Sequence, residues 1–251
     1  METRIKINKP IPITENFSWK EVKKKKIKEN DEKLISLNMI PEKIIVRSQY
    51  FIQGIKGALP ECYVRESVYD KLIEATNYLP NGYKLLIYDA WRPEIVQYEL
   101  YESFKKELQS QKPDLNEDEI EDRVEEYVAL PSNKKDCPSP HLTGGAVDLT
   151  VIDANGKVLD MGTGFDETID ATHTDYYERM KEKRKLTNEE EKVLKNRRLL
   201  YNTMLLAGFS NYPHEWWHFD YGNQLWAYML NKKNALYNAA APKLRWKHSY
   251  R

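Results

Sequence analysis

The segment Ser139-Pro-His-Leu-Thr-Gly-Gly-Ala-Val-Asp148, which continues as Leu-Thr-Val-Ile152, decides the fold around the candidate site. Residues 146–152 form an apolar run that is typical of a strand. If the chain were extended from His141 to Asp148, their Cα atoms would lie ~23 Å apart, too far for both side chains to reach one metal ion. Thr143-Gly144-Gly145 lets the chain fold back between them, because glycine adopts backbone conformations that other residues avoid.

His141 and Asp148 are therefore candidate ligands of one metal ion. A carboxylate inside an apolar strand must face solvent or be paired, because burying an unpaired charge is costly. Taken alone, Asp148 would be an ordinary outward-facing strand residue and His141 a loop histidine. The combination of a histidine, two folding glycines and an aspartate in a strand favours a metal site instead.

A second motif, His214-Glu-Trp-Trp-His218, literally matches the H-E-x-x-H pattern of helical zinc sites. Pro213 directly before it and the aromatic residues around it argue against a helix and favour a strand. No acidic residue follows Asp220, so the downstream glutamate ligand of one group of such enzymes is absent. We therefore take only Glu215 and His218 from this motif, with His214 as a neighbour.

With His141, Asp148 and His218 as ligands, the site has three protein groups and one open position, as is typical of catalytic zinc. Zinc lowers the pKa of a bound water towards ~7, and a nearby carboxylate can accept the proton and deliver it to the leaving amine. Glu215 is the candidate for this general base. Residues three apart in a straight strand face opposite sides, so we expect a bulge or a tight loop at Trp216-Trp217.

An arginine in Asp89-Ala-Trp-Arg-Pro93 lies between a predicted strand over 83–88 and a predicted helix over 94–111. A positive charge fixed at that point suits a developing oxyanion, which makes Arg92 a candidate catalytic residue. The alternative is a surface arginine that pairs with Asp89.

The remaining segments predict helices and strands that meet through turns. Further helices are expected from a capping box at Ser18 and Glu21, over about 68–79 and 116–130, and from a capping box at Thr187 and Glu190 to Gly208. Further strands are expected over 43–47 and 215–221, with a hairpin turn at 153–156. The pattern predicts an α+β fold, a single domain with a central, mainly antiparallel sheet flanked by helices. Residues 1–42 are predicted to be an N-terminal arm with a short helix, and residues 43–251 the domain that holds the site.

The composition of the 251 residues excludes several classes of partner. Lys plus Arg and Asp plus Glu each number 39, so no net positive charge favours nucleic acid or an anionic membrane. No stretch approaches the ~20 apolar residues of a membrane span, and the N-terminal residues lack the apolar region of a signal peptide. Cys62 and Cys137 lie outside any metal-binding pattern, which favours free thiols in a reducing compartment. We therefore expect a cytoplasmic protein.

In this order, the three motifs resemble those of the D-alanyl-D-alanine dipeptidases, zinc enzymes that include the vancomycin-resistance dipeptidases. The family pattern Ser-x-His-x-x-Gly-x-Ala-x-Asp is matched by Ser139, His141, Gly144, Ala146 and Asp148, the pattern Glu-x-Trp-His by Glu215, Trp217 and His218, and the family arginine by Arg92. A fourth segment, Met161-Gly-Thr-Gly-Phe-Asp166, is similar to the family segment whose aspartate receives the free amino group of the substrate.

The resemblance implies a compact α+β catalytic domain over residues 43–251, one zinc ion per chain, and hydrolysis of a small D,D-dipeptide, D-alanyl-D-alanine. It implies that Ser139 and Asp166 bind the ammonium end and that Arg92 stabilises the tetrahedral intermediate. The first 40 or so residues match no part of the family, and a tyrosine that the family uses near the amine site has no counterpart here. The charged segment 173–190 is interpreted as an insertion near the mouth of the site.

Two alternatives stay open from the sequence. A D,D-carboxypeptidase or endopeptidase of longer cell-wall peptides would share the same ligands, although the segment ending at Asp166 and the missing signal peptide favour a dipeptidase. A non-catalytic, metal-containing binding protein of the same fold would have little reason to keep Glu215. The sequence predicts no oligomeric state.

Overall fold

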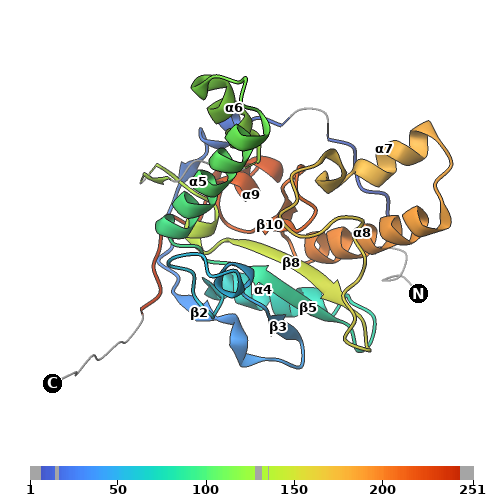
Figure 1. Cartoon of the computed structure of the whole chain (residues 1–251). Helices are drawn as coiled ribbons and strands as arrows, with labels where there is room; N and C mark the ends of the chain where they lie inside the picture. The colour runs from blue at the N-terminus through green and yellow to red at the C-terminus, as the bar shows by residue number, and fades with distance from the viewer. Residues whose placement is uncertain (1–6, 15–16, 128–131, 135, 244–251) are drawn as a thin grey trace.

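A five-stranded sheet in the order β3-β5-β8-β10-β9 forms the centre of the computed structural model, which describes residues 7–14, 17–127, 132–134 and 136–243 (Figure 1). The strands are β3 (Ile44–Val46), β5 (Lys84–Asp89), β8 (Ala146–Ile152), β9 (Ser210–Asn211) and β10 (His218–Asp220). β8 lies in the middle, and every one of its residues is buried. The strand predicted over 146–152 is confirmed, and Asp148 lies inside the protein.

The central sheet is mixed. β8 pairs antiparallel with β5 and β10, and β10 pairs antiparallel with β9, whereas β3 pairs parallel with β5. A parallel neighbour needs a crossover connection, which here contains α3 (Gln49–Ile52), β4 (Tyr63–Arg65) and α4 (Glu66–Thr76). The prediction of an α+β fold with a mainly antiparallel sheet is confirmed. In the sheet as described, the pairing of β3 with β5 is the one that is parallel.

Three two-stranded sheets add to this centre. β1 (Lys26–Ile27) pairs with β11 (Asn234–Ala235), β2 (Leu34–Ser36) with β4, and β6 (Asn133–Lys134) with β7 (Cys137–Pro138). The described part of segment 1–42 is thus joined to the rest of the chain through β1 and β2. The domain boundary at residue 42 stays a prediction.

Two pairs of helices lie on different sides of the molecule in Figure 1. α5 (Glu94–Gln111) packs against α6 (Glu117–Tyr127), while α7 (Tyr176–Lys183) packs against α8 (Asn188–Leu206), which also contacts α4. The short α2 (Trp19–Val22) contacts α9 (Gln224–Met229). The helices predicted over 68–79, 94–111 and 116–130 correspond to α4, α5 and α6, and the predicted end at 128–130 lies outside the described residues.

The structure also tests three smaller predictions. A bridge between Ile152 and Val158 closes the hairpin turn predicted at 153–156. Cys62 and Cys137 are both free thiols, as expected. In the part of the chain that the structure describes, none of the helices is both long enough and apolar enough to cross a membrane.

The two predicted capping boxes have different outcomes. At the start of α8, the Thr187 hydroxyl accepts a hydrogen bond from the Glu190 amide at 3.2 Å, and the Glu190 carboxylate accepts one from the Thr187 amide at 2.8 Å. At Ser18 the predicted short helix forms as α2, but the predicted capping box is wrong, because no side-chain cap bond forms at the start of this helix. Glu21 pairs instead with Lys24 at 2.6 Å, which takes away the partner that the box requires.

Thr187→Ala should lower the free energy of unfolding by about 1 kcal/mol, because removing an N-cap hydroxyl leaves a helix amide without its partner. Ser18→Ala is the matched control, and its free energy of unfolding should stay close to that of the unmodified chain. Urea denaturation followed by circular dichroism measures both values. Equal destabilisation by the two substitutions would contradict this account of the Thr187 cap.

Candidate active site

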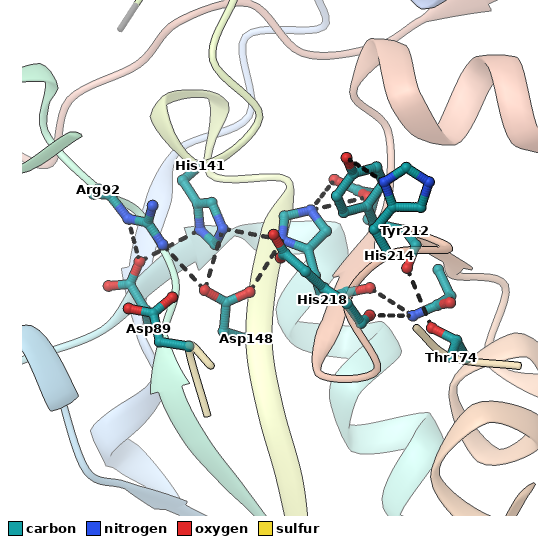
Figure 2. A network of polar contacts seen from close by, with 12 residues as sticks. Asp89, Arg92, His141, Asp148, Thr174, Tyr212, His214 and His218 are labelled. Atoms are coloured by element: carbon teal, nitrogen blue, oxygen red, sulfur yellow. Dashed lines mark hydrogen bonds and ion pairs between the residues drawn. The ribbon is translucent and has the colours of Figure 1, made fainter. Parts of the chain in front are cut away.

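Three buried side chains from three different elements converge beside β8. Asp148 of β8 lies opposite His218, the first residue of β10, in the strand register. His141 begins a short 3-10 helix, His141–Thr143, which ends at Gly144 with a φ of 72°. This left-handed conformation turns the chain back between His141 and Asp148, as predicted from Gly144 and Gly145. Figure 2 shows His141, Asp148 and His218 pointing toward one another.

The ligand atoms of these three side chains have the spacing of a metal site. His141 Nε2 lies 3.2 Å from His218 Nδ1 and 3.4 Å from Asp148 Oδ2, and His218 Nδ1 lies 3.0 Å from Asp148 Oδ1. A tetrahedral zinc ion with ligands at about 2.0–2.1 Å holds neighbouring ligand atoms about 3.3 Å apart. The spacing of this group therefore fits such an ion.

In both histidines, the ring nitrogen that points away from the group (His141 Nδ1 and His218 Nε2) already has a hydrogen-bond acceptor. This determines the protonation of the inner nitrogens, His141 Nε2 and His218 Nδ1. His141 Nδ1 lies 2.7 Å from the carbonyl oxygen of Ala90, which can only accept a hydrogen bond, so Nδ1 carries the proton. His218 Nε2 lies 3.1 Å from Oδ2 of Asp220, a residue whose side chain is 0% exposed. Each inner nitrogen is then left with a lone pair. Two lone pairs and the Asp148 carboxylate face one another, and a cation is the partner that such a group requires.

Asp148 is held in its ionised form. Burial alone would raise its pKa, but positive charge on the His141 and His218 rings, with the hydrogen bonds that they donate, outweighs that effect and keeps the pKa of Asp148 well below its usual range. A metal cation would supply this positive charge when the inner nitrogens present lone pairs instead. The carboxylate is therefore available as a negatively charged ligand.

Arg92 is buried next to this group, with 8% of its surface exposed. Its Nε donates to Asp89 at 2.8 Å, its Nη1 to Gln97 at 2.8 Å, and its Nη2 to Asp148 at 3.1 Å. The pair with Asp89 is present, but Arg92 is buried and lines a cavity, so the alternative of a surface arginine is wrong. The three acceptors fix the plane of the guanidinium.

Glu215 lies on a tight turn before β10. The His218 amide donates to the Glu215 carbonyl at 3.3 Å, which closes the turn expected at Trp216-Trp217. The strand predicted from residue 215 therefore begins only at His218. The turn brings Glu215 Oε2 to 3.8 Å from His218 Nδ1. Enclosure of the carboxyl group, together with the nearby carboxylates, raises the pKa of Glu215 to about 8. A carboxyl group that exchanges its proton near neutral pH suits acid–base catalysis.

His214 is not part of the ligand group found among the described residues. Its Nδ1 lies 3.3 Å from the Tyr212 hydroxyl, and its ring stacks on His173 with centroids 4.8 Å apart. None of the described helices includes residues 214–218, so the geometry agrees with taking only Glu215 and His218 from this motif. The contact also places His173, at the start of segment 173–190, beside the site.

Asp166 and Ser139, the two predicted substrate-binding residues, lie in different surroundings. Asp166 is open to solvent, lines the cavity and accepts a hydrogen bond from the Tyr50 hydroxyl at 3.1 Å. Ser139 is buried, and its hydroxyl oxygen accepts a hydrogen bond from the Ser132 amide at 2.9 Å. Among the described residues that line the cavity, its neighbour Pro140 is present and Ser139 is not.

One cavity of about 340 Å³ connects these groups, a volume that suits a small ligand. Its polar lining includes Arg92, His141, Asp148, Asp166, Glu215 and His218. Its apolar lining includes Trp19 of α2, Leu100 and Phe104 of α5, and Tyr212.

Residues 32–238 match the family model of the D-Ala-D-Ala dipeptidases, so the expectation that the first 40 or so residues match no part of the family is wrong from residue 32 onward. The chain belongs to this family. A D-alanyl-D-alanine dipeptidase of Synechocystis sp. is 31% identical over 209 residues, which cover 73% of this chain and 84% of that protein. The D-alanyl-D-alanine dipeptidase of Escherichia coli is 32% identical over 140 residues, 56% of each chain. That of Enterococcus faecalis is 26% identical over 139 residues, 55% of this chain and 62% of that protein.

For this member of the dipeptidase family, three residues of the site were missed by the sequence analysis. Tyr50 provides a tyrosine near Asp166, but the two residues are 116 positions apart and Tyr50 belongs to no motif. Asp220 follows the candidate ligand His218 by two positions, and an aspartate in a strand gives no sequence signal that it bonds to this histidine. Trp19 lies outside the residues that match the family model.

Proposed function

We propose that this family member is a zinc-dependent dipeptidase that hydrolyses D-alanyl-D-alanine and similar small D,D-dipeptides. The observation behind the proposal is the convergence of three metal-ligand side chains beside Glu215, inside a cavity that also contains Arg92 and Asp166. Membership of the dipeptidase family supports a peptidase activity.

His141, Asp148 and His218 would hold the zinc ion, because two imidazole nitrogens and one carboxylate oxygen suit zinc and leave one position open. When bound, zinc supplies a water of lowered pKa and polarises the carbonyl of the peptide. Asp220 keeps the proton on His218 Nε2, so that Nδ1 stays directed at the metal position. The Ala90 carbonyl has the same effect on His141.

Glu215 acts as the general base and afterwards as the general acid. It takes a proton from the attacking water and passes it to the nitrogen of the leaving amino acid. Arg92, held by Asp89 and Gln97, stabilises the negative charge that develops on the carbonyl oxygen.

Asp166 binds the free ammonium group of the substrate, and the Tyr50 hydroxyl orients the Asp166 carboxylate. Four carboxyl groups surround the single guanidinium of Arg92, namely Asp89, Asp148, Asp166 and Glu215. Even with Glu215 protonated, the other three carboxyl groups outnumber the one guanidinium, and such an excess of acidic groups suits a metal cation together with an ammonium group. From the family resemblance we keep Ser139 as a further residue of the ammonium site.

Two other functions are less well supported. A D,D-carboxypeptidase or endopeptidase of longer cell-wall peptides would use the same ligands, but Asp166 in the cavity wall favours a substrate with a free amino group. A non-catalytic metal-binding protein is disfavoured by the position of Glu215 next to His218. We also propose a cytoplasmic location, because the two cysteines are free thiols.

N-acetylated D-Ala-D-Ala should be cleaved at least about tenfold more slowly than the free dipeptide, because acetylation removes the charge that Asp166 binds. Sites with buried acceptors discriminate by several orders of magnitude, and we expect less here because Asp166 is open to solvent. Steady-state kinetics on both substrates measures the ratio, and Asp166→Ala should narrow it. If the acetylated peptide or a pentapeptide is cut as fast as the free dipeptide, the carboxypeptidase alternative takes the place of our proposal.

A further inference from the structure

The end of the cavity formed by Asp166 and Tyr50, which we call the amine end, fixes the direction in which a bound dipeptide would lie. Asp166 contacts the Tyr50 hydroxyl, and this hydroxyl lies 3.4 Å from Arg92 Nη2. Arg92 in turn donates to Asp148 of the ligand group. With the ammonium group at Asp166 and the carbonyl group at Arg92, the second residue must extend past the ligands, away from Asp166.

The side of the ligand group opposite Arg92 is aromatic. The ring of Tyr212 stands 5.9 Å from the ring of His218, and the ring of Trp19 lies 5.5 Å from that of Tyr212, centroid to centroid. Figure 2 shows Arg92, His141, His218 and Tyr212 following one another across the site. The contacts therefore lead from the amine end, through the ligands, to Trp19.

This aromatic end has apolar walls that are held in place. Trp19 and Tyr212 line the cavity at this end, and Leu100 and Phe104 of α5 are further apolar residues of the same cavity. The Phe17 ring packs edge-on behind both, 5.3 Å from Trp19 and 5.2 Å from Tyr212. A ring supported in this way presents a fixed apolar surface, which favours a large apolar group of the ligand over water.

Trp19 comes from a segment outside the family match, which begins at residue 32. α2 contacts α9, and this contact brings the segment over the cavity. The wall that Trp19 forms is therefore an addition of this chain to the residues that match the family model.

We infer that this aromatic end is a subsite for the side chain of the leaving residue, and that the chain prefers D,D-dipeptides whose second residue is large and apolar. The inference rests on the proposed dipeptidase function. A second D-alanine offers one methyl group to these walls, whereas a second D-phenylalanine covers much more of their apolar area.

The test compares kcat/KM for D-Ala-D-Phe and D-Ala-D-Ala with the zinc-loaded full chain. We expect a ratio of about ten or more in favour of D-Ala-D-Phe, and a fall of about tenfold in that ratio in Trp19→Ala, because a lost apolar wall costs discrimination of this size. Trp19→Phe should keep most of the preference, since a flat apolar ring remains. Leu100→Ala, on another part of the wall, should lower the ratio in the same direction. Tyr98→Ala is the control and should leave the kcat/KM ratio unchanged, because Tyr98 is an exposed aromatic residue of α5 outside the cavity lining.

The outcomes separate the subsite from the function on which it rests. Hydrolysis of both dipeptides with the same ratio in Trp19→Ala, Leu100→Ala and the unmodified chain would overturn the subsite and leave the dipeptidase proposal intact. A native preference for D-Ala-D-Ala over D-Ala-D-Phe would overturn it as well. If the zinc-loaded chain cleaves neither dipeptide, the proposed function fails and the inference fails with it.

Discussion

Glu215→Gln is expected to bind zinc like the unmodified chain and to lose at least about a hundredfold in kcat on D-Ala-D-Ala. General acid–base catalysis contributes about 10²–10⁴-fold to such reactions, and an amide of nearly the same shape cannot accept the proton of water. Glu215 Oε2 lies 3.8 Å from His218 Nδ1, so the substitution removes the proton acceptor next to the ligand group. Steady-state kinetics and metal analysis of the same preparation measure the two quantities.

Glu191→Gln is the matched control for this substitution. Glu191 pairs with Lys181 on the surface of α8, so its change of charge should leave both kcat and zinc content as they were. A Glu215→Gln protein with an unchanged kcat would exclude the mechanism. A Glu215→Gln protein that loses its zinc would show that Glu215 is needed for the metal and not only for proton transfer.

Local patterns predicted much of the fold. The apolar run at 146–152 became β8, and Pro93 precedes α5, which begins at Glu94. The parallel direction of β3 depends instead on the crossover through α3, β4 and α4, and no residue in the strand itself encodes that path. Ser18 shows a second limit of sequence patterns. The capping-box pattern considers only Ser18 and Glu21, whereas in the structure Glu21 forms an ion pair with Lys24 instead.

The site was predictable where its residues lie in spaced motifs. His141, Asp148 and His218 were predicted from folding glycines and a strand register, and the structure brings them together. Tyr50 and Trp19 reach the cavity only through tertiary contacts between distant segments, so no spacing in the sequence could indicate them. Ser139 lies within a motif, its hydroxyl accepts a hydrogen bond from the Ser132 amide, and its role in binding the ammonium group stays a prediction. The spaced motifs therefore indicate the candidate metal ligands, whereas the walls of the pocket depend on tertiary contacts.

Replacing one ligand should have the largest effect on the metal. His218→Ala is expected to lose zinc, because it leaves only two ligands and removes a nitrogen that lies 3.0 Å from Asp148 Oδ1 and 3.2 Å from His141 Nε2. Loss of an outer partner of a ligand costs about 10–100-fold in metal affinity, and loss of the ligand itself should cost more. Zinc titration against a competing chelator measures the affinity, and circular dichroism on the metal-free proteins checks that the variants fold.

A graded series makes the metal prediction specific. Asp220→Asn should weaken zinc by about 10–100-fold, because an amide holds the His218 Nε2 proton less firmly than a carboxylate does. His214→Ala should leave the affinity unchanged, since His214 bonds to Tyr212 and stacks on His173, outside the ligand group. Stoichiometric zinc in His218→Ala would refute the ligand assignment. Loss of zinc in His214→Ala would instead revive the H-E-x-x-H interpretation, in which the two histidines of residues 214–218 bind the metal together. The order His218→Ala, Asp220→Asn, His214→Ala, from strongest to weakest loss, follows only from the arrangement in which His218 Nδ1 faces the metal and Nε2 faces Asp220.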